Sequence, residues 1–112
     1  MRVISKSRLR EFWQTPAHAD SEGPLAAWYK HVETADWTMS SDVKSDFVHV
    51  DFVGNCAVFN IGGNKYRLIA RILYPYHKVY ILRVMTHKQY DNDPWQRECG
   101  CHSPPPKKKP SR

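Results

Sequence analysis

The sequence predicts an α+β fold, in which two N-terminal helices pack on one face of a small antiparallel β-sheet and a flexible basic C-terminal tail follows. Three observations lead to this prediction. Apolar residues recur at helical spacing in the first third of the chain, they alternate with polar residues from Val58 onward, and they are missing after Trp95. A chain of 112 residues is long enough for one domain with one hydrophobic core.

The first helix is expected over residues 5–14. Leu9, Phe12 and Trp13 form an apolar stripe among charged neighbours in this segment. Pro16 should end the helix, because a proline pushes the residue before it out of helical geometry.

A second helix is expected to begin at residues 21–23, and Pro24 suits its first turn, where a missing N–H costs no helical hydrogen bond. Its core-facing stripe has the i, i+3, i+4, i+7 spacing and consists of Leu25, Trp28, Tyr29 and Val32. Residues 34–45 are polar, so we expect an irregular segment there. Residues 47–53 fit either a strand or a packed loop.

Three strands of an antiparallel meander are expected next. The first is the short segment that starts at Val58, and the paired glycines at 62–63 predict a two-residue hairpin turn with positive φ angles. The second strand is expected over residues 64–74. A turn at residues 75–77 then leads into the third strand, over residues 78–85.

The chain is expected to form one folded domain over residues 1–96, followed by a disordered tail over residues 97–112 that is rich in cysteine, proline and lysine. No apolar run approaches the roughly 20 residues needed to span a bilayer. Arginine and lysine interrupt the N-terminal segment, so no signal peptide is predicted. We therefore expect a soluble, cytoplasmic protein without membrane contact.

The three cysteines are irregularly spaced, which argues against a disulfide framework and favours a reducing compartment. Cys99, Cys101 and His102 form a C-x-C-H pattern. Zinc sites typically have a wider cysteine spacing and a second pair of ligands, so the pattern argues against a metal site. No cofactor is predicted.

The formal net charge of +6 favours phosphate polymers as partners, although many soluble proteins share this bias. If Tyr74 lies opposite Lys78, then Ile69 lies opposite Arg83 and Lys65 lies near His87. Two sets of side chains then separate onto the two faces of the sheet.

One set is apolar and faces the core: Phe59 (placed opposite Tyr66 by the glycine turn), Tyr66, Leu68, Ala70, Ile72, Tyr74, Tyr80, Leu82 and Val84. The other face carries Arg67, Arg71 and Arg83 and approaches His87. It could be merely a solvated sheet face. However, like charges on neighbouring strands repel, and a bound polyanion would relieve this repulsion, which favours a phosphate-binding face.

Two segments of the chain carry a specific resemblance: "VFNIGGNKYRLIARI", residues 58–72, and "VYILRVMTHKQYD", residues 79–91. Together they resemble the HigB family of toxins in type II toxin–antitoxin pairs, which belongs to the wider RelE-like group of small proteins that cleave messenger RNA. The likeness covers about 35 residues of the three expected strands. The two helices in front of them also fit the layout of that family.

The resemblance implies a RelE-like fold and a toxin that cleaves mRNA, in many relatives on the ribosome, and thereby inhibits translation. It implies catalysis without a metal or organic cofactor, and neutralisation by a HigA-like antitoxin. Contact with DNA is expected only through the antitoxin. Such cleavage needs a base for the attacking 2′-OH, donors for the charge on phosphorus, and an acid for the departing 5′-oxygen.

Four residues are predicted to be catalytic. Arg67 matches the strand arginine of the family near the scissile phosphate, and a guanidinium suits this role because its planar fork fits phosphate oxygens. His87 and Tyr90 match the terminal polar motif and could transfer protons. Arg83 is a supporting donor, although many family members carry arginine one position earlier, where this chain has Leu82. That departure either puts the role of Arg83 in question or indicates a bulge.

Lys65, Arg71 and Lys88 are predicted to bind the RNA backbone. Other interpretations remain open for several residues. His87 could be an ordinary surface histidine, Tyr90 could cap the core or stack on a base, and Asp91 is better suited to orient a partner than to carry chemistry. The whole protein could also be a non-catalytic RNA- or ribosome-binding module, or a degenerate toxin that still binds its antitoxin and DNA.

Overall fold

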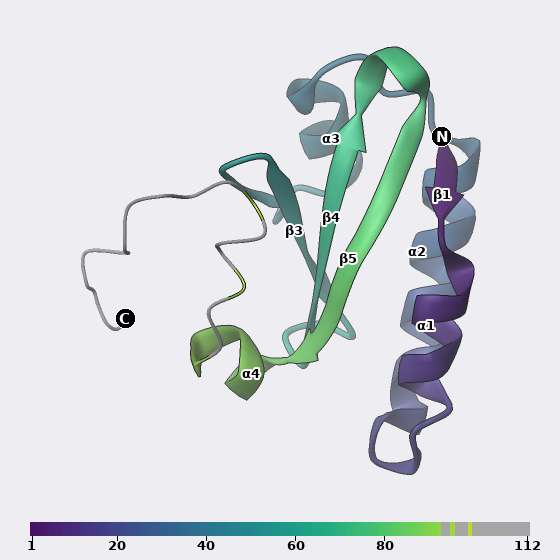
Figure 1. The fold of residues 1–112 in the computed structure, drawn as a ribbon, viewed down its shortest axis with the longest axis vertical. Helices are drawn as coiled ribbons and strands as arrows, with labels where there is room; N and C mark the ends of the chain where they lie inside the picture. The colour runs from purple at the N-terminus through teal and green to yellow at the C-terminus, as the bar shows by residue number, and fades with distance from the viewer. Residues whose placement is uncertain (93–94, 96–98, 100–112) are drawn as a thin grey trace.

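The computed structural model of the chain describes residues 1–92, 95 and 99, which form one mixed β-sheet with helices (Figure 1). The sheet order is β1-β5-β4-β3-β2. In chain order the elements are β1 (Arg2–Ile4), α1 (Lys6–Trp13), the 3-10 helix η1 (Pro16–Ser21), α2 (Glu22–Thr34), α3 (Ser40–Asp46), β2 (Asp51–Val53), β3 (Cys56–Ile61), β4 (Tyr66–Leu73), the 3-10 helix η2 (Tyr74–Tyr76), β5 (Lys78–Thr86) and α4 (His87–Asn92).

The predicted α+β class is confirmed, but the sheet is mixed rather than antiparallel. β1 runs parallel to β5, with Arg2 beside Lys78 and Ile4 beside Tyr80. The sequence analysis missed β1 because three residues are too few to show an alternating pattern, and the partner strand lies far along the chain. The other strand pairs are antiparallel.

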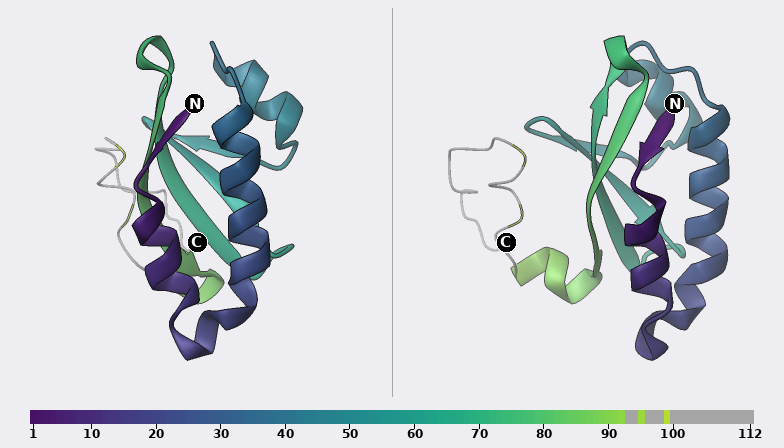
Figure 2. Two further views of the ribbon diagram at one scale, coloured as in Figure 1. Left: turned by 90° about the vertical axis from the view of Figure 1, so that its right-hand side faces the viewer. Right: turned by 45° about the vertical axis from the view of Figure 1, so that its right-hand side comes forward.

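Helices α1 and α2 lie along one face of the sheet, whereas α4 continues from the end of β5 on the other side (Figure 2). The main core lies between this helix pair and the sheet. Leu9 and Val32 from the helices, and Leu68 and Val79 from the sheet, are fully buried in it. The side chain of Ser5 accepts a hydrogen bond from the N–H of Ser7 and so caps the start of α1. None of the helices in the described residues is long and apolar enough to cross a membrane.

Residues 34–45 are not irregular, as the sequence analysis expects, because Ser40–Asp46 form α3. The carboxylate of Asp42 accepts hydrogen bonds from the backbone N–H and the hydroxyl of Thr38, at 2.8 and 2.9 Å. Val43 is the one buried residue of α3. A helix with a single core contact shows no apolar stripe in its sequence, which explains the wrong prediction.

The β3–β4 hairpin has a four-residue turn rather than the predicted two-residue turn. Ile61 pairs with Tyr66, and Phe59 therefore lies opposite Leu68, not opposite Tyr66. Gly62 and Gly63 do have the predicted positive φ angles, 62° and 70°. Because the register shift is two residues, Phe59 still faces the main core.

The register of β4 and β5 is confirmed at one end and shifted at the other. Ile69 lies opposite Arg83 as predicted, but Leu73 rather than Tyr74 lies opposite Lys78. An irregularity between Ile69 and Ala70 leaves Leu82 as an extra residue on β5.

This bulge changes which side chains of β5 face the main core. Val79 and Ile81 are buried there, instead of Tyr80 and Leu82. Leu82 packs against a second, smaller cluster on the opposite face of the sheet. The buried members of that cluster are Cys56, Val58, Ile69, Met85, Trp95 and Cys99. The predicted arginine-bearing face is therefore partly covered by apolar side chains.

Candidate active site

Most of the predicted site residues lie where β4 begins, β5 ends and α4 starts; Arg71 does not. The backbone N–H of His87 donates a 3.2 Å hydrogen bond to the carbonyl of Lys65, so these two residues are close, as the sequence analysis expects. Arg67 pairs with Met85, two residues before His87. The sheet therefore delivers Arg67, His87 and the side chains of α4 to one corner of the molecule.

A capping box fixes the start of α4. The N–H of Gln89 donates to the hydroxyl of Thr86 at 3.1 Å, and the N–H of Thr86 donates to the side-chain carbonyl of Gln89 at 3.0 Å. This is the reciprocal pattern of a threonine followed three residues later by a glutamine. The sequence analysis missed this signal, although "THKQ" has the threonine and the glutamine of a capping box at the required spacing. It explains why the strand gives way to a helix at His87.

Arg67 is only 9% exposed, and its guanidinium is held in place by neighbouring backbone and side chains. Nη1 donates to the carbonyls of Asn64 and Tyr66, at 3.3 and 3.2 Å. Nη2 donates to the side-chain oxygen of Asn64 at 2.7 Å. A guanidinium has five N–H donors, so three are used, and two have no acceptor in the described part of the chain. The sequence analysis did not single out Asn64.

Tyr90 connects Arg67 to the segment after α4. Its ring centre lies 5.3 Å from the guanidinium carbon of Arg67. The ring also stacks on Trp95 with a centroid distance of 4.8 Å, and the Trp95 indole N–H donates to the Tyr90 carbonyl at 2.8 Å. The sequence analysis assigned no role to Trp95. A cation near an aromatic ring is stabilised by the negative ring face, so the contact with Tyr90 favours the observed position of the Arg67 guanidinium.

His87 is exposed and pairs with an acidic residue one helical turn later. Its Nδ1 lies 3.1 Å from a carboxylate oxygen of Asp91. A carboxylate at Nδ1 favours the neutral tautomer that carries its proton there, which leaves Nε2 able to accept a proton. The geometry agrees with an orienting role for Asp91.

Lys65 is exposed but ion-paired. Its ammonium contacts one carboxylate oxygen of Asp20, and the hydroxyl of Tyr66 donates to the other. Hydrogen bonds from Lys65 and Tyr66 lower the pKa of Asp20, and the same carboxylate raises the pKa of Lys65. Asp20 thus ties η1 to the edge of the site, and a phosphate would have to compete with it for Lys65.

The remaining predicted residues lie at different positions relative to this corner. Arg83 is half-buried and lies on the same face as Arg67, because the bulge at Leu82 brings both Leu82 and Arg83 to that face. This is the bulge that the departure from the family pattern indicates. Lys88 is exposed on the first turn of α4. Arg71 is exposed four residues along β4 from Arg67, away from the corner.

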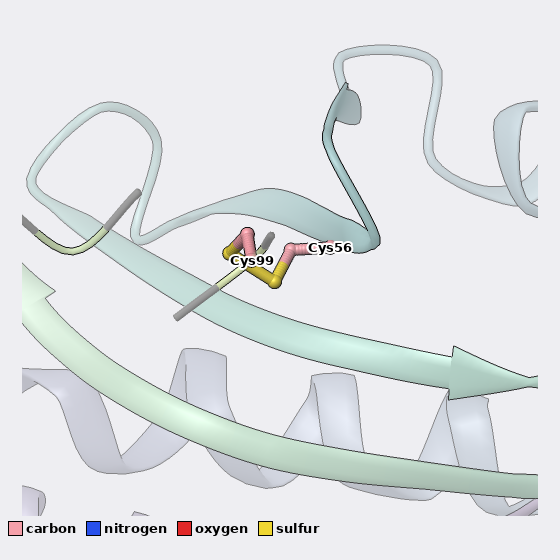
Figure 3. Close-up of a disulfide and its surroundings, with 2 residues drawn as sticks. All are labelled: Cys56 and Cys99. Atoms are coloured by element: carbon pink, nitrogen blue, oxygen red, sulfur yellow. A yellow bond between two sulfur atoms is a disulfide. The ribbon is translucent and has the colours of Figure 1, made fainter. Parts of the chain in front are cut away.

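A disulfide joins Cys56 at the start of β3 to Cys99, with their Cα atoms 5.2 Å apart (Figure 3). The expectation of no disulfide framework is therefore wrong for these two cysteines. Linear spacing gave no sign of the pairing, because residues 43 positions apart come together only in the folded chain. Because the argument for a reducing compartment assumed that the cysteines are unpaired, it no longer holds. Cys99 belongs to the predicted tail; Cys101 and His102 lie outside the described residues.

The arrangement can bind a phosphate and move a proton. Arg67 is a cation held by three hydrogen bonds, with two N–H donors left without an acceptor among the described residues. The histidine on the first turn of α4 is oriented by a carboxylate. Within the described residues, no three His, Cys, Asp or Glu side chains are grouped as a metal site would require.

Comparisons with known proteins agree with the motif segments. A family model described as HigB toxin, the RelE-like toxic component of a toxin–antitoxin system, matches residues 21–93. The proteins called mRNA interferase toxin HigB of Escherichia coli (strain K12) and mRNA interferase HigB of Escherichia coli O157:H7 and Shigella flexneri are each 53% identical over 34 residues. These matches cover 30% of this chain, and the chain spans about a third (33%) of the length of these relatives.

Proposed function

This chain belongs to the HigB toxin family, the RelE-like toxic component of toxin–antitoxin systems, and from that premise we propose that it is an endoribonuclease that cleaves mRNA on the ribosome and inhibits translation. The observation that supports this most directly is the contact of Arg67 with Tyr90, one turn of α4 from His87. The relatives named mRNA interferase are similar to this chain over about a third (33%) of their own length. Its proposed partner is a HigA-like antitoxin that also mediates any contact with DNA, and its proposed location is the cytoplasm.

The proposed reaction uses the 2′-OH of the RNA as the nucleophile. His87 accepts its proton at Nε2 while the 2′-oxygen bonds to phosphorus, and the bond from phosphorus to the 5′-oxygen breaks. Tyr90 gives its phenolic proton to the departing 5′-oxygen. Arg67, supported by Arg83, donates hydrogen bonds to the phosphate oxygens as negative charge develops there. The products carry a 2′,3′-cyclic phosphate and a 5′-hydroxyl group.

The test is cleavage of RNA by purified protein, with and without ribosomes. Arg67→Ala should lower kcat by about a hundredfold to a thousandfold, as expected for the loss of one donor aimed at developing charge. His87→Ala should lower it by a similar factor. Arg10→Ala on α1 and His49→Ala are matched controls, because both side chains are exposed and neither residue lies on β4, β5 or α4; neither change should alter the rate.

One observation favours a second candidate, a non-catalytic RNA- or ribosome-binding module. Arg67 is 9% exposed and already makes three hydrogen bonds, so its side chain could have a purely structural role. The two candidates differ in the RNA ends produced. If the wild-type protein generates no new ends in either condition but still binds RNA, the endoribonuclease proposal is wrong. If it cuts and both variants cut equally well, only the residue roles are wrong.

The toxin role has its own test. Induction of the gene in a growing culture should arrest growth, and co-expression of an antitoxin encoded next to it should restore growth. Arg67→Ala should remove the arrest while still binding the antitoxin. Growth that continues at a verified level of soluble protein would count against toxicity.

A further inference from the structure

Two residues that follow α4 pack on the face of the sheet that carries Arg67. Trp95 and Cys99 are buried, with 2% and 0% of their surface exposed. They complete the second apolar cluster together with four residues of the strands: Cys56, Val58, Ile69 and Met85. Met85 pairs with Arg67, and directly opposite residues of an antiparallel pair share one face of the sheet. The second cluster therefore adjoins the guanidinium-bearing end of the candidate site.

Cys99 is fixed to the sheet by two links. Its side chain forms the disulfide with Cys56 at the start of β3 (Figure 3), and its carbonyl accepts a 2.7 Å hydrogen bond from the N–H of Asn55. Trp95 precedes Cys99 by four positions, so the chain lets their Cα atoms separate by at most about 14 Å. While the disulfide is closed, Trp95 is held between two fixed points, α4 and Cys99.

Trp95 contacts Tyr90 in two ways. The two rings stack with their centroids 4.8 Å apart, and the indole N–H of Trp95 donates a 2.8 Å hydrogen bond to the carbonyl of Tyr90. The Tyr90 ring in turn lies 5.3 Å from the guanidinium carbon of Arg67. A series of contacts thus joins the disulfide-linked cluster to two of the proposed catalytic residues.

The position of α4 depends on these contacts. The helix has six residues, and a helix of this length is marginal in water without tertiary packing. Tyr90 is half-buried and packs against the second cluster, whereas every other residue of α4 is exposed. Apart from the capping box, α4 is therefore attached to the sheet mainly through Tyr90. A displaced Tyr90 would also displace His87 on the first turn.

We propose that the Cys56–Cys99 disulfide makes RNA cleavage sensitive to thiol redox state. When the disulfide is closed, it holds Trp95 against Tyr90; when a dithiol reductant opens it, Trp95 is released and kcat falls. This inference rests on the proposed ribonuclease function and adds a condition for its full rate. Trp95 and Cys99 both follow residues 21–93, which the family model matches. Because the cytoplasm keeps most thiols reduced, the toxin would cut RNA fastest when thiols become oxidised.

Opening the disulfide is a two-electron reduction by thiol–disulfide exchange. A thiolate of the dithiol attacks the sulfur of Cys56 or Cys99, the bond between the two protein sulfurs breaks, and a mixed disulfide with the reductant forms. The second thiol of the reductant then displaces the protein sulfur. The protein gains two electrons and two protons as two thiols, and the dithiol becomes a disulfide. Because both cysteines are buried, the attack requires local opening of the second cluster.

The experiment compares RNA cleavage by the oxidised protein and by the protein reduced with dithiothreitol, with ribosomes in both samples. Alkylation of free thiols followed by intact-mass measurement gives the oxidised fraction. Reduction should lower kcat by about tenfold or more, because a displacement of about 1 Å in an active site can cost about a hundredfold. KM should change little, since Lys65 and Arg71 are not on α4.

Variants test each link separately. Cys99→Ser should cut as slowly as the reduced wild type and should not respond to dithiothreitol. Cys101→Ser is its matched control and should keep the wild-type rate and response. Trp95→Ala should lower kcat in the oxidised protein, whereas Trp95→Phe retains a ring that can stack and should restore most of the rate. Reduction of Trp95→Ala should add no further decrease, because the disulfide and Trp95 act through the same contact.

A measurement without RNA separates positioning from general stability. The indole N–H of Trp95 donates to Tyr90, and that of Trp37 donates to the carboxylate of Asp46. On reduction, the NMR signal of the Trp95 indole N–H should shift and exchange faster with water, while the Trp37 signal stays unchanged. All rates are measured well below the melting temperature of the reduced protein, where a disulfide that only stabilises the fold leaves kcat unaltered.

The outcomes distinguish this inference from the function on which it rests. If the wild-type protein cuts RNA with the same kcat in both redox states, the inference is refuted and the ribonuclease proposal stands. If the reduced protein cuts faster, Trp95 restrains the site instead of ordering it, and the inference is overturned. If neither form generates new RNA ends, the proposed function fails and the inference fails with it, whatever the Trp95 signal does.

Discussion

The guanidinium carbon of Arg67 lies 5.3 Å from the centre of the Tyr90 ring, so a β4 residue and an α4 residue form one contact at the candidate site. Trp95 stacks on the same ring at 4.8 Å. The Tyr90 ring thus makes one cation–π contact, with Arg67, and one stacking contact, with Trp95, and neither needs its hydroxyl group. Its ring and its hydroxyl can therefore be tested separately.

Tyr90→Phe should keep the ring contacts and lose the proposed acid. We expect kcat for RNA cleavage to fall by about a hundredfold, the lower end of the range for general acid catalysis, with the melting temperature nearly unchanged. Tyr76→Phe is the control, because Tyr76 is exposed on η2. Steady-state cleavage kinetics and thermal melts check both. Wild-type kcat in Tyr90→Phe would leave the ring with a packing role only.

Thr86→Ala should destabilise α4 and, with it, the positions of His87 and Tyr90. The variant loses the N-cap acceptor that bonds the N–H of Gln89, which typically costs about 1 kcal/mol. Thr86→Ser retains the hydroxyl and should stay close to wild type. We expect hydrogen exchange to speed up in α4 and kcat to fall in the alanine variant. Equal exchange in the two variants would show that the capping box contributes little.

Several parts of the fold were predictable because their signals are local. The alternation of apolar and polar residues predicted β4. The paired glycines located the hairpin, because glycine adopts positive φ angles without steric cost wherever it stands in the fold. The predicted pairing of Ile69 with Arg83 is correct although the turn is one residue longer than predicted, because the extra residue Leu82 on β5 offsets that difference. β1 and α3 were missed, because each depends on contacts from elsewhere and carries little pattern of its own.

The candidate site was predictable in its residue types and less so in its arrangement. Motif positions supplied Arg67, His87 and Tyr90. They gave no sign that Asn64 would occupy three N–H donors together with the backbone, because that requires the four-residue turn. The disulfide to Cys99 was beyond prediction, since it joins segments that only the folded sheet brings together.

The Cys56–Cys99 disulfide should contribute measurably to stability. A cross-link between residues 43 positions apart restricts the unfolded chain, and typical disulfides contribute about 2–4 kcal/mol. We expect Cys99→Ser to lower the free energy of unfolding in urea by that amount. Reduction of the wild-type protein should have the same effect, and reduction of the variant should have none. Cys101→Ser is the control for a general thiol effect; a loss equal to that of Cys99→Ser would contradict the pairing.

Asp46 should make stability depend on pH in the acid range. The indole N–H of Trp37 donates to its carboxylate at 2.9 Å, and His31 Nε2 lies 3.2 Å from the same oxygen. The hydrogen bond from Trp37, supported by His31, holds the pKa of Asp46 below the ordinary value of 3.8. A carboxyl group whose pKa is lower in the folded state binds its proton more readily when the chain is unfolded. The Asp46 carboxylate therefore contributes to the free energy of unfolding above pH 3.8, and this contribution disappears as the pH falls through the folded-state pKa.

Asp46→Asn removes the titrating group and should make the free energy of unfolding less dependent on pH in the acid range. Urea unfolding at a series of pH values from neutral to strongly acidic measures it, and the variant should lose less stability on acidification than the wild type. Asp51→Asn provides the control, since Asp51 is exposed and makes no hydrogen bond or ion pair through its side chain within the described residues. Because Trp37 is buried in the main core, its fluorescence should follow the same transition. Parallel pH curves for wild type and Asp46→Asn would show that the Trp37–Asp46 bond does not couple folding to protonation.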